Sequence, residues 1–340
     1  MSLAEVNLAF LCVSIILYCL LAGADFGAGI LEFFTGKKLQ TEQRELITHA
    51  IAPVWEANHV WLVLGLVILF NGFPKAYSFI STDFHIPLTL LLIGIVLRGC
   101  AFTFRHYDAV KDNSQRYYTA VFVISSFLSP LFLGIIAGGI ILGKAPIEVQ
   151  DFHSTFIAPW LNSFCLSMGF FTCSLFTFLA SVYLIGETTD PILQSIFVKR
   201  AFWSNFFAVV SGALVLISAA SLKHPLAQRF LHEPMALSCM VLATLLLFPL
   251  WRSIRRSQII PSRIYAAAQV VLVLLGWFRL QYPSLASAAS GESQVDLTIF
   301  NTAAPEATQI QLLYALIAGC ALIFPALFFL FRIFKRKEHK

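Results

Sequence analysis

The sequence predicts an all-α polytopic membrane protein with nine transmembrane helices. Three observations carry that prediction: 58% of the 340 residues are hydrophobic, only 12% are charged, and the mean hydropathy is +0.79. Soluble domains usually contain about a quarter charged residues and at most half apolar ones. The composition therefore excludes a soluble enzyme, a disordered chain and a nucleic-acid-binding protein that would rely on the net charge of +5.

Each predicted helix is a mostly apolar segment of about 20 residues, the length that crosses a bilayer. Backbone groups in lipid must bond within their own segment, so these segments are expected to be helical. The seventh is short, and the fourth and fifth are long enough to tilt or to extend beyond the bilayer. The nine segments are residues 7–31, 52–72, 83–104, 117–142, 156–185, 200–222, 235–251, 261–281 and 310–333.

We expect a single integral membrane domain over residues 1–340. The first four helices and the next four are predicted to form two four-helix bundles, with the ninth helix peripheral. The first helix lacks a preceding basic region and a small-residue cleavage site, so we interpret it as a retained helix and not a signal peptide. The longest loop, residues 282–309, is expected to be flexible or to form part of a docking surface.

The charges between the helices predict the orientation. Seventeen of the 23 Lys and Arg residues lie in the first, third, fifth and seventh loops and in the C-terminal tail. Because positive residues near membrane helices favour the cytoplasmic side, the N-terminus is expected outside, in the periplasm, and the C-terminus inside. An odd number of helices, nine, fits this arrangement.

All seven cysteines fall inside the predicted helices, where they act as small apolar residues and not as a disulfide framework. No arrangement of His, Cys, Asp and Glu in the sequence indicates a metal site, and no nucleotide-binding or hydrolase motif occurs in a suitable context. The cysteines are residues 12, 19, 100, 165, 173, 239 and 320.

Ionisable side chains inside membrane helices are costly and therefore mark candidate functional sites. Asp25 lies in the first predicted helix, Glu56 and His59 in the second, and Arg98 in the third, with Arg105 at its end. Asp25, Glu56 and Arg98 are expected at a similar depth near the cytoplasmic surface, so one Arg could compensate two carboxylates. His59 follows Glu56 by three residues, which predicts that both lie on one helix face.

Two interpretations of this group remain open at this point. In the first, Asp25, Glu56 and Arg98 form a buried ion-pair network that fixes helix packing. In the second, Glu56, with Asp25 and His59, forms a proton path that opens toward the cytoplasmic side, because carboxylates and histidines relay protons in membranes. Arg98 and Arg105 would supply charge compensation in either case.

The small and aromatic residues around these charges predict close packing. Gly23, Gly27 and Gly29 allow a neighbouring helix to approach the first helix closely. Trp55 and Trp61 are expected at the membrane interface or in the core between helices.

Haem ligation by this chain alone is not expected. A haem within a bundle needs His or Met ligands at matched depth. Among the histidines only His59 and His85 lie near membrane depth, and they are predicted at opposite surfaces. The intramembrane methionines, Met168 and Met240, are isolated.

Three segments resemble subunit II of cytochrome bd-type quinol oxidases, a membrane protein family. Residues 23–29, Gly-Ala-Asp-Phe-Gly-Ala-Gly, resemble its opening motif. Residues 55–61, Trp-Glu-Ala-Asn-His-Val-Trp, are similar to its tryptophan–acid–Gly–Asn–acid–Val–Trp segment. Residues 98–105, Arg-Gly-Cys-Ala-Phe-Thr-Phe-Arg, resemble its Arg-Gly-x-x-Phe-x-x-Arg segment. The three occur in the family's order and spacing, and the likeness is sharpest over residues 15–110.

The resemblance implies a subunit that is inactive alone and pairs with a larger subunit I. That partner carries the quinol site and the haems, of b type and in many members also d type. The complex oxidises ubiquinol and reduces dioxygen to water with protons from the cytoplasm, in the bacterial inner membrane. The resemblance also leaves room for a structural ubiquinone and a small third subunit.

The resemblance assigns roles to three residues in these motifs. The acid from which the family's proton path is proposed to start matches Glu56, with Asp25 and Arg98 near it. The second acid of that motif is replaced by His59, which changes the local charge. This departure makes the chain more similar to the cyanide-insensitive branch of the family, in which the haem content of the partner varies.

One alternative from another functional class stays open at the level of sequence. An independent secondary transporter or ion carrier would use Asp25, Glu56 and Arg98 as a coupling site. It predicts activity from this chain alone, whereas the oxidase subunit requires its partner. A third, purely scaffolding role would leave Glu56 replaceable by Gln.

Overall fold

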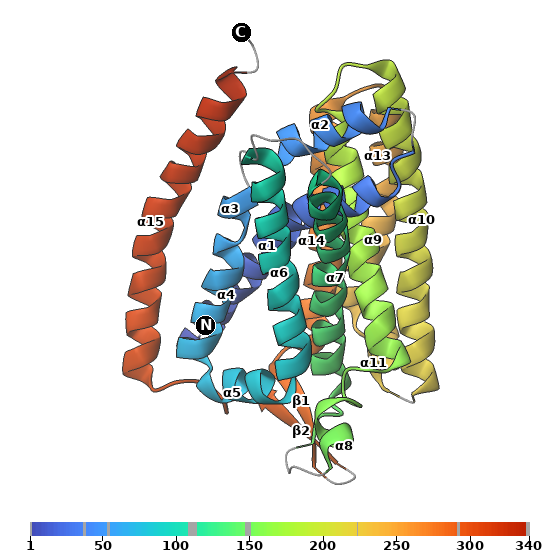
Figure 1. Cartoon of the computed structure of the whole chain (residues 1–340). Coiled ribbons are helices and arrows are strands. Elements are labelled where there is room, and N and C mark those ends of the chain that lie inside the picture. Colours follow the sequence, from blue (N-terminus) through green and yellow to red (C-terminus); the bar gives the residue numbers. More distant parts are fainter. Residues whose placement is uncertain are drawn as a thin grey trace.

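The computed structural model describes residues 2–36, 39–52, 55–107, 114–146, 151–222, 224–290 and 293–337, and these residues are overwhelmingly helical (Figure 1). Eight helices in these ranges are long and apolar enough to cross a membrane. The all-α polytopic fold predicted from composition is confirmed. The eight are α1 (Leu3–Phe33), α6 (His85–Tyr107), α7 (Ser114–Leu142), α9 (Ser163–Ile185), α10 (Pro191–Ser221), α12 (Pro234–Leu245) continued by α13 (Leu247–Arg255), α14 (Ile259–Gln281) and α15 (Glu306–Lys337).

The second predicted helix, residues 52–72, is present in a broken form. It consists of the single turn α3 (Trp55–Asn58) and the helix α4 (Val60–Gly72), with His59 at the junction. The segment Trp55–Gly72 forms a pair with α2 (Gln40–Ile51) that is bent by 58°. Counting this bent pair as one span brings the number of candidate spans from eight to nine. The sequence shows the apolar run but not the junction at His59, because no proline or glycine lies next to that residue.

Two further helix boundaries correct the sequence prediction. The fifth helix was expected at 156–185, but α9 begins at Ser163 because the Asn162 side chain accepts a hydrogen bond from the Cys165 backbone N–H at 3.0 Å. A side-chain oxygen in this position caps a helix. The sixth helix, expected at 200–222, begins earlier, where Asp190 caps α10 and Pro191 occupies its first turn.

The segments that connect the long helices gather at the two ends of the bundle. At one end lie α5 (Pro74–Asp83), α8 (Phe152–Phe156), α11 (Leu226–His232) and the β1–β2 hairpin, and at the other lies α2 (Figure 1). This division matches the alternation of loops expected from the span order. Residues 338–340, part of the basic tail used in the orientation argument, lie outside the described residues.

The loop 282–309, expected to be flexible or a docking surface, is ordered around a hairpin of β1 (Ser284–Ser290) and β2 (Ser293–Thr298). The Ala289 N–H donates to the Ala145 carbonyl at 2.8 Å, and Gln294 Nε2 donates to the Leu142 carbonyl at 3.2 Å. These bonds hold the hairpin against the end of α7. Alternating small residues in β1 gave no apolar pattern by which the sequence could have predicted it.

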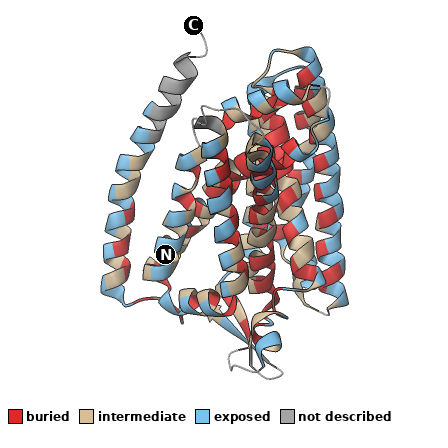
Figure 2. Cartoon of the chain, in the orientation of Figure 1, coloured by how far each residue is buried: buried red, intermediate tan, exposed pale blue. Residues whose placement is uncertain are grey.

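The core is centred on α1, α7 and α9, where buried residues concentrate (Figure 2). Helix α9 packs against α1, α7 and α10, and α6 packs against α7. On the other side of α9, α14 packs against α12 and α13. Helix α15 stands at the edge of the molecule and packs mainly on α1 and α4 (Figure 1). The division into two four-helix bundles with a peripheral ninth helix stays a prediction.

Candidate functional site

Asp25 and Arg98 form a buried ion pair between α1 and α6. The Arg98 Nη2 group donates to Asp25 Oδ1 and also to the Asp25 backbone carbonyl at 3.3 Å. The Arg98 side chain is fully buried and that of Asp25 is 3% exposed. The guanidinium lies over the Phe26 and Phe122 rings, 5.2 and 5.1 Å from their centroids. The arrangement neutralises two charges that would be costly apart in this apolar environment.

The hydrogen-bonding capacity of this pair is only partly used. Asp25 Oδ2 and Arg98 Nε and Nη1 are buried and have no hydrogen-bond partner within the described part of the chain. The Asn58 side chain, itself buried, lies next to the Asp25 carboxylate. Native proteins rarely leave buried polar atoms unsatisfied, so such atoms call for a specific explanation.

A second ion pair repeats the first one two helical turns closer to the end that carries α2. Arg105 Nη1 donates to both carboxylate oxygens of Glu32, each at 2.8 Å, and Arg105 Nη2 donates to Thr48 Oγ1 at 3.1 Å. Arg44 Nε lies 3.0 Å from Glu32 Oε1. The Glu32 side chain is fully buried. Arg105 thus compensates Glu32 and ties α6 to α1 and α2.

Sequence reasoning missed Glu32, although a signal was present. Glu32 follows Asp25 by seven residues, and Arg105 follows Arg98 by seven. Seven residues span about two helical turns, or roughly 10 Å along the axis. Arginine side chains spaced in this way on one helix can therefore reach both acids of another helix that runs in the same direction. The matched spacing of acids in one helix and arginines in another could have identified the second pair.

Glu56 does not join the buried pair, contrary to the prediction that one Arg would compensate two carboxylates. Its side chain is exposed on the single turn α3, while Asn58 of the same turn faces Asp25. No described residue forms a salt bridge or side-chain hydrogen bond with Glu56. Two positions of one turn, separated by Ala57, thus place an amide at the buried pair and a carboxylate on the surface.

His59 and Glu56 were expected on one helix face, and in the structure the Glu56 side chain is exposed while that of His59 is half-buried. His59 stands at the junction of α3 and α4, half-buried, with its ring centroid 5.8 Å from that of Phe26 and 6.2 Å from that of Tyr18. Its Nδ1 atom is buried without a hydrogen-bond partner in the ranges described. The His59 N–H still donates to the Glu56 carbonyl at 3.3 Å, so the turn continues through the junction. That the two side chains share one face stays a prediction.

The three glycines of α1 lie where neighbouring helices touch it. A Cβ atom at Gly27 would collide with the Phe176 carbonyl of α9, and one at Gly23 would meet the Phe176 ring at 2.8 Å. A Cβ atom at Gly29 would collide with Ser126 of α7. Close approach therefore requires glycine at these positions. This contact holds the segment that carries Asp25 against the core.

The two tryptophans take different positions beside the site. Trp55 is half-buried, and its ring lies 5.6 Å from that of Phe102 on α6. Trp61 is 4% exposed and lies 6.0 Å from Phe324 on α15. Trp55 thus contacts α6 next to Gly99, and Trp61 lies between α4 and the edge helix.

The described histidines do not form a haem pocket. His59 is held between Tyr18 and Phe26, and the other histidines with described side chains lie at helix ends or in the connecting segments. His85, for example, hydrogen-bonds through Nδ1 to the Thr82 carbonyl at 2.8 Å. Among the residues with a described placement, no three His, Cys, Asp or Glu side chains are grouped to hold a metal ion.

Comparison with known proteins places these features in a family. The family described as cytochrome bd terminal oxidase subunit II matches residues 3–334. The chain is 30% identical to cytochrome bd ubiquinol oxidase subunit 2 of Bacillus subtilis, over 59% of this chain and 57% of that protein. It is 28% identical to cytochrome bd-I ubiquinol oxidase subunit 2 of Escherichia coli K12, over 50% of this chain and 45% of that protein. The matched regions thus span about half the length of these curated relatives.

A solved structure shares the whole fold. One chain of the bd oxidase from Geobacillus thermodenitrificans superposes with a TM-score of 0.80, covering 98% of this chain and 99% of that chain, at 19% sequence identity. At this identity the likeness concerns the fold alone.

Proposed function

The chain belongs to the cytochrome bd terminal oxidase subunit II family, and we propose that it acts as one subunit of a membrane quinol:oxygen oxidoreductase. The observation that carries the proposal is the family match over residues 3–334. The substrate pair is ubiquinol and dioxygen, in keeping with the names of the two curated relatives. The complex sits in the bacterial inner membrane, with the N-terminus of this chain in the periplasm and its C-terminus in the cytoplasm.

The redox centres of the proposed complex reside in a larger partner subunit. The described side chains of this chain provide no haem pocket, since His59 packs against aromatic rings and lacks a second axial ligand at its depth. Haem of b type, with or without haem d, would supply the electron transfer and oxygen chemistry in that partner. This chain forms an obligate heterodimer with it, and a small third subunit and a structural ubiquinone are compatible with the assembly.

The contribution of this chain to the reaction is proton supply. Glu56, exposed on α3, is the entry group. Asn58 of the same turn lies next to Asp25 of the buried Asp25–Arg98 pair, and His59 stands at the junction of α3 and α4. An exposed carboxylate can exchange protons with water or with a partner's groups, and buried acids and histidines relay them. The position of Asn58, on the same turn as Glu56 and next to the buried Asp25, supports this role.

The test is the Glu56→Gln variant of the full complex. We expect quinol-dependent oxygen uptake to fall about tenfold or more, because the amide keeps the shape of the side chain but cannot carry a proton. The reduced-minus-oxidised visible spectrum of the affinity-purified complex should stay unchanged, which shows that the partner and its haems are still present. Glu56→Asp should retain much of the activity.

Glu45→Gln is the matched control, since Glu45 is another exposed glutamate, on α2 at the same end of the bundle. It should leave oxygen uptake at the wild-type rate. Wild-type turnover in Glu56→Gln would reject the proton path and favour a scaffolding role. A tagged chain that purifies alone and colourless, from cells that express the neighbouring genes, would reject the oxidase proposal itself. No observation on this structure favours the transporter alternative.

A further inference from the structure

Four cations gather where α10 begins and α13 ends, away from the candidate site. All are exposed, and none forms an ion pair or a side-chain hydrogen bond with a residue in the described ranges. The four residues are Lys199, Arg252, Arg255 and Arg256.

Two acidic side chains between α9 and α10 are already engaged. Glu187 Oε1 accepts a hydrogen bond from Arg263 Nη2 at 2.6 Å. Asp190 Oδ1 accepts from the Ile192 backbone N–H at 2.8 Å and so caps α10. The cation group therefore keeps its positive charge, which favours an anionic ligand.

Two adjoining cavities open among these cations, of about 590 and about 600 Å³. Phe202, Trp251 and Arg255 line both. The first cavity also reaches the beginning of α14, where the Gln258 side chain does not cap the helix. Uncapped N–H groups at a helix start add a favourable field for a phosphate.

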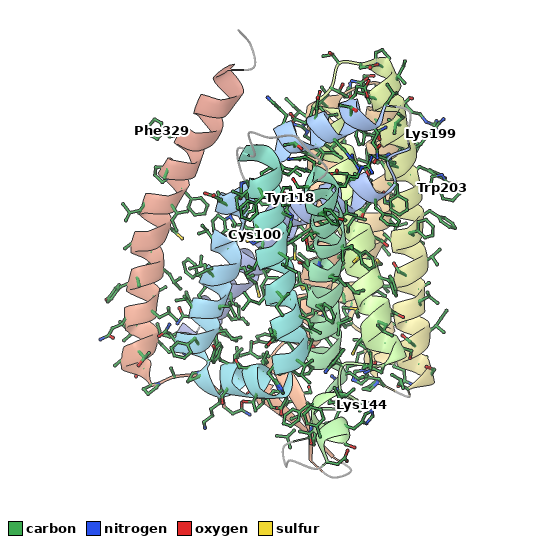
Figure 3. All side chains as sticks on the ribbon, viewed as in Figure 1. Cys100, Tyr118, Lys144, Lys199, Trp203 and Phe329 are labelled. Carbon is green, nitrogen blue, oxygen red and sulfur yellow. The ribbon has the colours of Figure 1, made fainter. Side chains whose placement is uncertain are left out.

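Exposed aromatic rings mark the boundary between this polar region and the apolar flank of the bundle. Phe202 is 55% exposed, Trp203 56% and Phe248 75%. Figure 3 shows Lys199 and Trp203 projecting outward from the same side of α10. Trp rings favour the level of lipid headgroups, and a Lys one turn away can reach the phosphates there.

Beyond the aromatic rings an apolar cavity of about 410 Å³ continues between α9, α10, α12 and α14. Leu247 lines both this cavity and the one beside the arginines. Ala208 and Gly212 of α10 line one side of this cavity, and Met240 of α12 lines another. A charged head region and an apolar channel therefore meet along one groove.

We propose that this groove binds an anionic phospholipid. The phosphate lies among Lys199, Arg252 and Arg255, and an acyl chain occupies the apolar cavity between α10 and α12. Charge complementarity selects this occupant, because basic pockets between membrane helices bind acidic lipid headgroups on the cytoplasmic side. The groove lies on α10, at the opposite edge of the molecule from α15 (Figure 1). The inference does not rest on the proposed oxidase function.

Lipid titrations of the purified protein, in the assembly in which it is isolated in mild detergent, test the proposal. Binding of dioleoylphosphatidylglycerol, followed by native mass spectrometry, should be tighter than binding of dioleoylphosphatidylcholine. The variant K199Q/R252Q/R255Q should weaken phosphatidylglycerol binding by about fivefold per cation, roughly 100-fold in all, and abolish the preference. The three cations have no described partner, so the variant should elute like the wild type in gel filtration.

Two further variants distinguish recognition of the headgroup charge from recognition of the lipid acyl chain. Arg116→Gln removes an exposed cation at the start of α7, at the same end of the bundle, and should leave the affinity unchanged. Val209→Trp places a large ring in the apolar cavity, which Val209 lines, and should weaken the long-chain lipid while sparing dihexanoylphosphatidylglycerol.

Three outcomes would overturn the proposal. Equal affinity of the triple variant and the wild type for phosphatidylglycerol would show that the cations do not bind it. Equal affinity for phosphatidylcholine would remove the charge recognition. Displacement of phosphatidylglycerol by inorganic phosphate alone, together with no effect of Val209→Trp, would assign the cations to a free anion instead of a lipid.

Discussion

At the scale of single residues, Arg98 links α6 to α1 through its side chain. Its guanidinium is fully buried beside Asp25 and between two phenylalanine rings. Removing one member of a buried pair leaves the other charge in an apolar environment, and this costs more than removing both. The pair is therefore needed for stability whether or not Asp25 also carries protons.

Stability measurements on single and double variants of this pair should show that dependence. We expect Arg98→Met and Asp25→Leu each to destabilise the protein by about 3–5 kcal/mol, and the double variant to lose less than the sum. Thermal unfolding in detergent, followed by loss of the monodisperse gel-filtration peak, measures the effect. Additive losses would indicate that the two charges do not interact.

Asp83, at the opposite end of the molecule, makes the free energy of unfolding depend on pH. It ends α5, outside the membrane-spanning helices, and burial raises its pKa to about 6, an effect that neighbouring His85 partly opposes. The folded state holds the Asp83 proton more tightly than the unfolded chain does. The stabilisation of the fold by this proton is therefore full below about pH 4 and is lost as the pH rises through 6. Asp83→Asn should therefore raise the melting temperature at pH 7 and flatten its dependence between pH 4 and 7.

Asp151 is the control for this measurement, because its pKa shifts the other way. Its exposed carboxylate accepts hydrogen bonds from Ser154 at the start of α8, and these bonds lower its pKa. Its stabilising contribution is thus present at neutral pH and is lost as the pH falls below its ordinary range. Asp151→Asn should lower the melting temperature at pH 7 slightly. A rise in both variants would point to net charge instead of the local environments.

At the scale of elements, the contact between α1 and α9 depends on the absence of side chains. Gly27 lies against the backbone of Phe176. The backbone of a helix, unlike a flexible side chain, cannot move aside to make room for an added methyl group. Dense interiors transmit such misfits into backbone shifts. The position of Asp25, two residues before Gly27, depends on this contact.

Gly27→Ala tests the α1–α9 contact directly. We expect a destabilisation of about 1–3 kcal/mol from overpacking, despite the better helix propensity of alanine. The melting temperature of the purified protein should fall by several degrees. Gly319→Ala on α15 is the matched control, since nothing lies within 4 Å of the added methyl group. It should melt at or slightly above the wild-type temperature; a similar fall in both variants would rule out a specific clash.

At the scale of the whole molecule, the two ends of the bundle differ in charge and structure. One end carries α2 and the cation group of α10 and α13, and the other carries α5, α8 and the hairpin (Figure 1). Positive-inside logic assigns the first end to the cytoplasm. The alternation of connecting segments shows which of them share an end of the bundle. It does not show which end faces the cytoplasm.

Cysteines introduced one at a time test which end of the bundle faces the periplasm. Lys75→Cys on α5 should react with a membrane-impermeant maleimide in intact spheroplasts, because the periplasm is then accessible. Glu42→Cys on α2 should react only after the membrane is permeabilised. Both parent side chains are exposed, and the unmodified protein with its seven cysteines gives the background. The reverse pattern would invert the orientation.

The site shows how far sequence reasoning reached. The intramembrane charges identified Asp25 and Arg98, and the structure joins them. The same reasoning grouped Glu56 with them by depth, but depth does not fix the direction in which a side chain points. A charge near a helix end is usually solvated, so Glu32 was not expected in the site, although its spacing from Asp25 matches that of Arg105 from Arg98. The fold shows that Glu32 is buried and that Arg44 pairs with it as well.

The sequence by itself determined the class of the molecule, the approximate positions of its helices and the family motifs at 23–29, 55–61 and 98–105. The physical reason is that lipid imposes one requirement on every spanning segment, apolar length, and this is a local property of the chain. The tertiary structure alone decided the break at His59, the outward position of Glu56, the hairpin after α14 and the groove between α10 and α12. These depend on which surfaces meet, and contacts between distant segments leave no local pattern in the sequence.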